Sequence, residues 1–299
     1  MTPLLTLLAL LAFAANSLLC RLALRSAAID PASFTGIRLA SGAVMLVVVG
    51  AGVAGKSGIA GRADMAGRWY GAVMLFLYAA GFSLAYVSLS AGTGALILFG
   101  AVQVTMLIAA IRSGERLGAA QWAGMAVAVA GLIYLVLPGL AAPSLAGAAL
   151  MATAGIAWGL YSVNGRGAAD PLGQTRHNFV LTIPMALLFL LPWLPKLSAT
   201  REGILLAVIS GAITSGLGYV IWYRALRSLS GVTASLVQLA TPVLAALGGI
   251  AFLSEPLSGR LLVSAVLVLG GIGLAARARM PQGKDLRGAH DDEFRPADT

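Results

Sequence analysis

Charged residues are scarce in this sequence, where Asp, Glu, Lys and Arg together make up 10% of 299 residues. In soluble domains these four types supply roughly a quarter of the residues. The hydrophobic types reach 59%, and the mean hydropathy is +0.90. Since a membrane-spanning helix needs about 20 mostly apolar residues, the composition indicates an integral membrane protein of many spans. Little chain remains outside the membrane, so a large soluble catalytic domain is excluded.

Cysteine is nearly absent, and the lone Cys20 excludes an internal disulfide. The net charge of +9 does not indicate nucleic-acid binding, because the basic residues occur singly or in pairs at the ends of apolar runs. The first apolar run lacks the basic segment that opens a signal peptide, so we expect it to be the first membrane span. The partners expected are the lipid bilayer and a small-molecule substrate, with no nucleic acid.

Ten apolar runs, bounded by charged residues, Gly or Pro, predict ten transmembrane helices and an all-α integral membrane protein. The runs of the first half cover Pro3–Leu22, Ala32–Val53, Trp69–Leu89, Gly94–Ile111 and Ala119–Leu137. Those of the second half cover Leu145–Asn164, Phe179–Leu194, Ile204–Tyr223, Thr233–Leu253 and Leu261–Ala276. The polar segment 279–299 is expected to be a disordered cytoplasmic tail.

The two halves resemble each other at a constant offset of 140 residues, as in Ser88–Ser90 and Ser228–Ser230. This offset predicts two five-helix repeats, residues 1–138 and residues 139–278. An odd number of spans in each repeat inserts the second copy into the membrane in the opposite sense. Such inverted repeats are typical of secondary transporters.

Basic residues are divided unevenly between the two ends of the predicted spans. With the N-terminus inside, fourteen of the 20 Lys and Arg residues fall on the cytoplasmic side, five fall outside, and Arg38 lies within the second span. Arg21 and Arg25 belong to the outer five. Because cytoplasmic loops carry the excess of Lys and Arg in membrane proteins, both termini are expected in the cytoplasm.

Four short motifs occur in order along the chain: Gly36–Arg38, Ala157–Gly159, Leu239–Val243 and Ser254–Leu257. With the ten spans and the repeat, they make residues 1–278 resemble the drug/metabolite transporter superfamily and its EamA branch. Length and aromatic usage are most similar to the YddG-type exporters of aromatic and other amino acids. The resemblance implies a multi-pass protein of the bacterial inner membrane. Such a protein would export aromatic and other neutral amino acids, or similar small metabolites, by alternating access and without a cofactor.

Aromatic side chains inside the spans are the first candidates for a substrate site. The candidates are five aromatic residues that lie within predicted spans: Tyr78, Phe82, Trp158, Tyr161 and Trp222. Phe82 and Trp222 are also mates at the repeat offset. Such rings can stack on an apolar substrate, so these residues could line a central cavity. Helix packing is the competing interpretation, and an interfacial aromatic belt is the interpretation favoured for Tyr86 near its helix end.

Polar side chains at membrane depth are the second group, because an unsatisfied polar group in lipid is costly. This group contains Asn16, Gln103, Gln238 and Arg38. Gln238 lies one turn before Pro242, whose missing N–H frees the Gln238 carbonyl for a ligand, although a tolerated kink is the alternative. Arg38 could meet a substrate carboxylate, or it could snorkel to the outer surface or bind helix carbonyls.

Acidic residues lie outside the predicted spans. Glu115 and Glu255 precede the fifth and tenth spans, where a carboxylate favours the N–H groups of a helix N-terminus, so both are expected to cap those helices. His177 is expected at the edge of the seventh span. Since no span contains an Asp or Glu, we predict transport down the substrate gradient that does not strictly require a proton gradient.

Other classes of function have less support from the residues. An intramembrane enzyme would need a paired acidic motif, an HExxH pattern or a P-loop, and none occurs. A nucleotide-sugar carrier of the same superfamily would be expected to offer a diphosphate more than one cation within the membrane. A drug or metabolite carrier of that superfamily is a further alternative, and a dimerising structural protein would lack a water-filled central cavity. No metal site is expected, the oligomeric state is left open, and a monomer is compatible with the sequence.

Overall fold

The computed structural model describes residues 2–53, 65–114, 117–139, 142–165, 170–226, 228–229 and 237–277. Within these ranges every regular element is a helix, apart from one isolated antiparallel bridge between Ile29 and Ala199. The all-α fold expected from the sequence is confirmed for this part of the chain. The expected tail, residues 279–299, lies outside the described residues.

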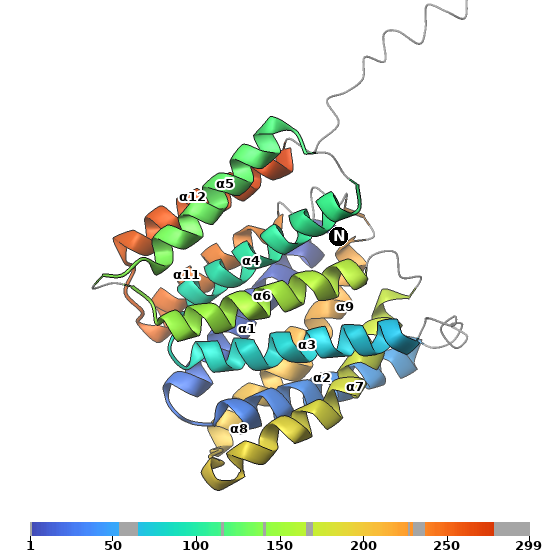
Figure 1. Ribbon diagram of the computed structural model, residues 1–299. Helices are drawn as coiled ribbons and strands as arrows, with labels where there is room; N and C mark the ends of the chain where they lie inside the picture. The colour runs from blue at the N-terminus through green and yellow to red at the C-terminus, as the bar shows by residue number, and fades with distance from the viewer. Residues whose placement is uncertain are drawn as a thin grey trace, which may run out of the picture.

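The first half contains α1 Thr2–Arg25, α2 Pro31–Val53, α3 Met65–Tyr86, α4 Ala91–Arg112 and α5 Ala119–Val136 (Figure 1). Short polar side chains determine where two of these helices begin. Asp30 Oδ1 accepts hydrogen bonds from the backbone N–H groups of Ala32 at 3.0 Å and Ser33 at 2.9 Å. Ser90 Oγ accepts from the N–H of Thr93 at 3.3 Å. These caps satisfy N–H groups that have no partner within their own helix.

The second half contains α6 Leu145–Asn164, α7 Pro171–Leu190, the 3₁₀-helix η1 Leu191–Lys196, α8 Arg201–Val208, the π-helix η2 Ile209–Leu217, α9 Gly218–Leu226, α11 Ala240–Leu253 and α12 Gly259–Arg277. The elements α8, η2 and α9 follow one another without a break. Together they form the eighth predicted span.

The seventh span begins earlier than the sequence predicted, at Pro171 and not at Phe179. Asp170 caps it, because its side chain accepts a backbone N–H of the first turn at 2.9 Å. Proline suits the first helical position, where its missing N–H is not needed. The polar residues that follow concealed this start from a prediction based on apolar runs. His177, expected at the edge of the span, therefore lies inside α7.

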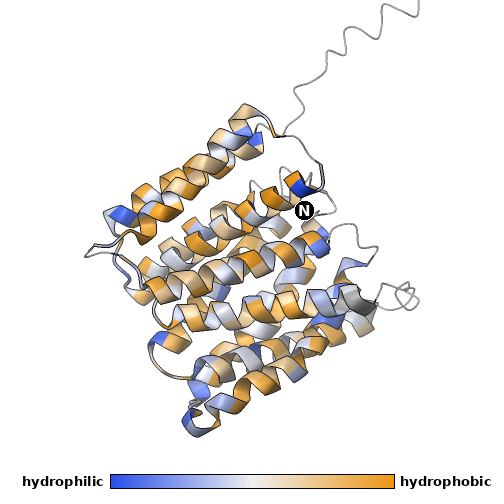
Figure 2. Ribbon diagram, viewed as in Figure 1, coloured by the Kyte–Doolittle hydropathy of each residue, from blue (hydrophilic) through white to orange (hydrophobic). Residues whose placement is uncertain are grey.

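Nine helices within the described ranges are long and apolar enough to cross a membrane. The ninth predicted span differs, because α11 has 14 residues and residues 230–236 before it lie outside the described part. Apolar residues run along the helices (Figure 2), and large apolar side chains are exposed on the bundle, such as Phe252 at 80% and Val266 at 72%. Soluble monomers rarely expose large continuous apolar surfaces. The molecule is a multi-pass membrane protein.

The helices of the two halves interlock in one bundle. α5 lies beside α12 at one side, and α2 lies beside α7 at the other (Figure 1). Between them, α6 packs against α3 and α4, while α1 packs against η2, α9 and α11. Small residues permit this close approach, since a Cβ on Gly155 of α6 would lie 2.6 Å from the carbonyl oxygen of Leu98 on α4. The centre of the molecule is therefore a junction of the two halves.

Candidate functional site

A small cavity lies at this junction, with walls from α1, α3, α4, α6, η2 and α9. Its lining residues are Phe13, Asn16, Ser17, Tyr78, Phe82, Leu98, Phe99, Trp158, Thr214, Ser215, Tyr219 and Gln238. The cavity volume of about 30 Å³ admits about two water molecules. Ligand pockets usually measure about 300–1,000 Å³, so helices must separate before a metabolite fits.

Trp158 of α6 is the centre of an aromatic cluster in the cavity wall. Its ring stacks on Tyr161 at a centroid distance of 5.2 Å and on Tyr219 of α9 at 5.3 Å, with interplanar angles of 26° and 22°. Tyr78 of α3 provides a third contact at 4.8 Å. Aromatic pairs are favourable at these separations. Three helices, α3, α6 and α9, thus bring their rings to one place.

The π-helix η2 supplies the polar lining residues Thr214 and Ser215. Asn16 of α1 is buried, and its Oδ1 accepts from Ser210 Oγ at 2.6 Å and from Thr214 Oγ1 at 3.2 Å. These contacts join the first half of the chain to the second. π-helices are rare and occur frequently at functional sites.

Arg38 of α2 lies directly behind the wall and is 2% exposed. Its Nη2 donates to the hydroxyl of Tyr78 at 3.0 Å, and its Nε donates to Ser215 Oγ at 3.3 Å. The guanidinium carbon lies 5.2 Å from the ring centroid of Tyr78 and 4.9 Å from that of Phe82, within the range of cation–π contacts. Nη1 has no hydrogen-bond partner among the described residues. Arg38 therefore does not snorkel to a surface.

Most of the residues predicted for the site meet at this cavity. Five of the nine line it directly: Asn16, Tyr78, Phe82, Trp158 and Gln238. Arg38 and Tyr161 contact the lining residues from behind, Arg38 through Tyr78 and Tyr161 through the ring of Trp158. Tyr161 also donates a hydrogen bond to Thr175 Oγ1 at 3.2 Å.

Trp222 and Gln103 are not among the lining residues. The ring of Trp222 meets Phe13 edge-on at 5.8 Å and belongs to a separate small cluster. Gln103 is half-buried on α4. Phe82 and Trp222, although mates at the repeat offset, therefore do not occupy equivalent places around the cavity.

Tyr219 is part of the cavity wall but is absent from the sequence prediction. The repeat offset of 140 pairs Tyr78 with Gly218, the residue before Tyr219, so the offset did not indicate Tyr219. The i→i+5 bonding of η2 widens the turn before α9, so later residues face a different direction from those of a continuous α-helix. The other unpredicted lining residues are Phe13, Ser17, Leu98, Phe99, Thr214 and Ser215. Their apolar or small side chains carry no signal that separates them from packing residues.

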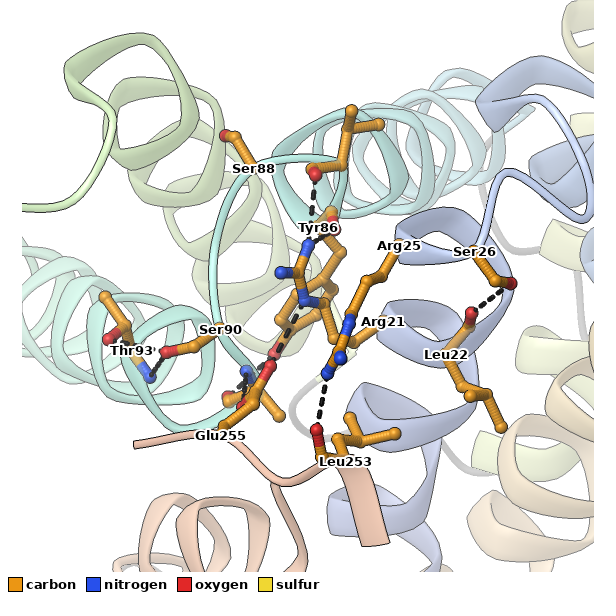
Figure 3. A network of polar contacts seen from close by, with 12 residues as sticks. Arg21, Leu22, Arg25, Ser26, Tyr86, Ser88, Ser90, Thr93, Leu253 and Glu255 are labelled. Carbon is orange, nitrogen blue, oxygen red and sulfur yellow. Dashed lines mark hydrogen bonds and ion pairs between the residues drawn. The ribbon is translucent and has the colours of Figure 1, made fainter. Parts of the chain in front are cut away.

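One end of the bundle is held together by a polar network around Arg21 and Glu255 (Figure 3). Arg21 Nε lies 3.1 Å from Glu255 Oε1, and the two side chains are 15% and 8% exposed. Arg21 Nη1 also donates to the carbonyl oxygens of Tyr86 at 2.9 Å and Val87 at 3.0 Å. Glu255 Oε2 accepts from the N–H of Ala91 at 2.8 Å. The network joins α1, the end of α3, the start of α4 and the segment after α11.

Glu255 caps a different helix from the one expected. Its carboxylate binds the N-terminus of α4, in the other half of the chain, and not that of α12, which begins at Gly259. Ser254 has a left-handed conformation with φ 51°, and the N–H of Glu255 donates to the carbonyl of Gly249 at 3.0 Å. This turn places the carboxylate beside α4. Glu115, expected to cap the fifth helix, lies outside the described residues.

The network lies one helical turn from the cavity. Arg21 follows the lining residue Ser17 by four positions on α1, and Tyr86 follows the lining residue Phe82 by four on α3. The rings of Phe82 and Tyr86 are in contact at 4.7 Å. Tyr86 is fully buried, and its hydroxyl donates to the carbonyl of Ala91 at 3.2 Å. The interpretation of Tyr86 as part of an interfacial belt is therefore wrong.

Comparison with known proteins identifies relatives along most of the chain. An uncharacterised protein of Pseudomonas aeruginosa is 50% identical over 279 residues, which are 93% of this chain and 96% of that protein. An uncharacterised transporter of Archaeoglobus fulgidus is 28% identical over 68% of this chain and 74% of its own. A probable terminal-alkyne amino-acid exporter of Streptantibioticus cattleyicolor is 28% identical over 69% of this chain and 71% of its own.

A crystal structure of a protein shares the fold, with a TM-score of 0.67 at 20% identity over 93% of this chain and 98% of that chain. The model of the EamA-like transporter family matches residues 145–277, which run from α6 to α12. The family match, the relatives and the apolar helices agree on one assignment. This chain therefore contains a domain of the EamA-like transporter family, a family of membrane transporters.

Proposed function

We propose that this protein is a secondary transporter of the bacterial inner membrane that exports small metabolites, with aromatic and other neutral amino acids as the leading substrates. The observation that carries the proposal is the aromatic cavity at the junction of the halves. Rings from Tyr78, Trp158 and Tyr219 suit an apolar or aromatic side chain, and Asn16 supplies an amide. The relation to a probable amino-acid exporter, 28% identical over 216 residues, supports amino acids as the class.

The packing of the helices supports two inverted repeats, residues 1–138 and residues 139–278. We match α1 to α5, in order, with α6, α7, the α8–α9 span, α11 and α12. Each main contact between the halves then has a counterpart in which the two repeats exchange roles. The contact of α3 with α6 corresponds to the contact of η2 and α9 with α1. The contact of α4 with α6 corresponds to that of α11 with α1. The contact of α2 with η2 corresponds to that of α7 with α3. A pseudo-two-fold axis produces such a pattern, and rocking of one repeat against the other gives alternating access.

We place both termini in the cytoplasm, on the charge asymmetry of the loops. The network of Arg21 and Glu255 then lies at the outer end of the bundle. In this arrangement the structure is closed towards the outside, and export requires the network to open. The small cavity volume of about 30 Å³ agrees with a state in which no substrate is enclosed.

We further propose that transport follows the substrate gradient and does not strictly require a proton gradient. Proton coupling through a membrane usually relies on an intramembrane acid or a histidine relay. The buried carboxylates of the described residues are Asp30 and Glu255, and both accept N–H groups at helix starts. His177 within α7 is the group to test, because a histidine relay is the alternative to an intramembrane acid. Counterflow at equal pH on both sides, with a protonophore and with His177→Asn in parallel, distinguishes the two mechanisms.

Counterflow in liposomes also tests the substrate, with labelled amino acids, a nucleotide sugar and a hydrophobic drug cation in one panel. Trp158→Ala removes the ring at the centre of the cluster and should slow aromatic amino-acid exchange about fivefold, since a stacking contact contributes about 1 kcal/mol. Trp122→Ala is the matched control, because Trp122 on α5 is 51% exposed and is not among the lining residues of the cavity. Equal rates in the two variants would contradict the site. Transport of the nucleotide sugar alone would favour the other carrier class.

A further inference from the structure

Arg38 carries a charge that nothing in the described part of the chain neutralises. A guanidinium stays protonated in proteins. The groups that contact it are the hydroxyls of Tyr78 and Ser215 and the ring faces of Tyr78 and Phe82, and all of these are neutral. At 2% exposure Arg38 gains little from solvent. A buried charge without a counter-ion is strongly unfavourable in a protein interior.

The buried carboxylates of the described residues are already engaged elsewhere. Asp30 lies two turns before Arg38 on α2, where it caps its own helix and accepts the N–H of Ser198 at 3.2 Å. Glu255 pairs with Arg21 at the end of the bundle. Neither carboxylate is in contact with the guanidinium of Arg38.

One nitrogen of the buried guanidinium lacks a hydrogen-bond partner among the described residues. Nε and Nη2 donate to Ser215 and Tyr78, whereas Nη1 has no partner within the described ranges. Tyr78, Ser215 and Phe82, which contact the guanidinium, are themselves lining residues, so Arg38 lies one side chain behind the cavity wall. Movement of Tyr78 and Ser215 away from Arg38, as α3 and η2 separate from α2, would let the guanidinium meet a molecule in the cavity.

We propose that Arg38 is the binding residue for a carboxylate of the transported molecule, which supplies the missing counter-ion. Nη1 and Nη2 would donate to the two carboxylate oxygens, the bidentate geometry that a guanidinium favours. Tyr78 would give up its bond to Nη2 and remain beside the ligand as a hydroxyl donor. The aromatic cluster around Trp158 would hold the apolar body of the same molecule. The substrate class is therefore an amphipathic monocarboxylate, and this inference rests on the proposed function for the location of the site.

A purely structural role for Arg38 predicts a different behaviour. Its bonds to Tyr78 of α3 and Ser215 of η2 would then fasten α2 to both neighbours and would contribute equally with any ligand present. Carboxylate recognition, in contrast, predicts that a ligand with a carboxylate binds more tightly than its neutral amide. The two roles can be separated by ligand binding without measuring transport.

The experiment compares 3-phenylpropionate with 3-phenylpropionamide in thermal unfolding of the purified full-length protein. A ligand that binds the folded state stabilises it by RT ln(1 + [L]/Kd), so at equal concentrations the ligand that binds more tightly raises the melting temperature further. In the wild type the carboxylate should bind at least about tenfold more tightly than the amide, as expected for a buried charge pair. In Arg38→Gln this preference should disappear, and in Arg112→Gln, which changes an exposed arginine at the end of α4, it should persist.

Three results would overturn the proposal: equal affinities for the two ligands in the wild type, no shift with either ligand, or a carboxylate preference that persists in Arg38→Gln. If Arg38→Gln does not fold, Tyr78→Phe provides the second variant. It keeps the guanidinium and frees Nη2, so it should retain or increase the preference for the carboxylate. Loss of the preference in Tyr78→Phe would contradict the proposal.

Counterflow with the same protein separates this proposal from the proposed function. A wild type that prefers the carboxylate in unfolding but exchanges no member of the substrate panel supports the Arg38 site and refutes export of that panel. A wild type that exchanges amino acids, with unchanged selectivity in Arg38→Gln, refutes the Arg38 site and leaves the proposed function in place.

Discussion

Glu255→Gln should weaken the closed state of the bundle end that Arg21 and Glu255 hold together. The carboxylate makes two charge-assisted bonds, 3.1 Å to Arg21 and 2.8 Å to the N–H of Ala91. Removal of one partner from a buried ion pair costs about 3–5 kcal/mol. Glutamine keeps the shape and one acceptor oxygen, and Arg21 keeps its bonds to the carbonyls of Tyr86 and Val87. The expected loss is therefore about 2 kcal/mol.

Cys20 is a natural reporter of this opening, because it is the single cysteine, is fully buried and directly precedes Arg21. When the closed form protects the thiol, its rate of modification by a small maleimide follows the population of the open form. A loss of about 2 kcal/mol raises that population about 30-fold. Mass spectrometry of the protein in liposomes, sampled over time, measures the rate in Glu255→Gln and in the wild type.

Glu202→Gln is the matched control, because it removes an exposed carboxylate from the first turn of α8, outside the network. Its rate should equal that of the wild type. Both variants should melt well above the assay temperature, which separates opening of one end from global unfolding. A rate in Glu255→Gln within about twofold of the wild type would correspond to less than about 0.5 kcal/mol and would refute the reasoning.

Two further predictions concern packing and topology. Gly211→Ala adds a methyl group that overlaps the backbone of α2, so it should destabilise the protein by about 2 kcal/mol, whereas Gly273→Ala, with open space around it, should be nearly neutral. Melting temperatures of the purified variants measure this, and equal values would contradict the close contact. In a Cys20→Ser background, an impermeant thiol reagent outside the cell should label Thr200→Cys and not Gln282→Cys. Outside labelling of Gln282→Cys would show that the C-terminus is not cytoplasmic.

The helices could be predicted from the sequence because lipid requires every membrane span to be a long apolar helix. Every span must be long and apolar, and the apolar runs therefore match nine helices of the described residues closely. Apolar runs do not reveal a helix that begins with polar residues. For this reason the sequence predicted that the seventh span begins at Phe179, whereas α7 begins at Pro171. The cap at Asp170 and the proline after it were the local signals for the correct start.

The site was only partly predictable because two of its features depend on tertiary contacts. The π-helix η2 turns Tyr219 into the wall, and a repeat offset taken from sequence assumes two regular helices. The carboxylate of Glu255 finds the start of α4 only because α11 packs beside that helix. The sequence indicated that Glu255 caps a helix. It did not indicate whether that helix is α12, which follows in sequence, or α4, which lies alongside in space.

A single face of α3 joins the two regions that the proposed cycle must coordinate. Tyr78, Phe82 and Tyr86 repeat at every fourth residue, and their rings are in contact at 5.4 Å and 4.7 Å. At one end of this row Tyr78 accepts from Arg38, and at the other the carbonyl of Tyr86 accepts from Arg21. Since all three rings belong to one rigid helix, a displacement of α3 that opens the cavity beside Arg38 also strains the bonds at the end of the bundle. In the proposed cycle, α3 would therefore transmit substrate binding to the opening of that end through these packed side chains.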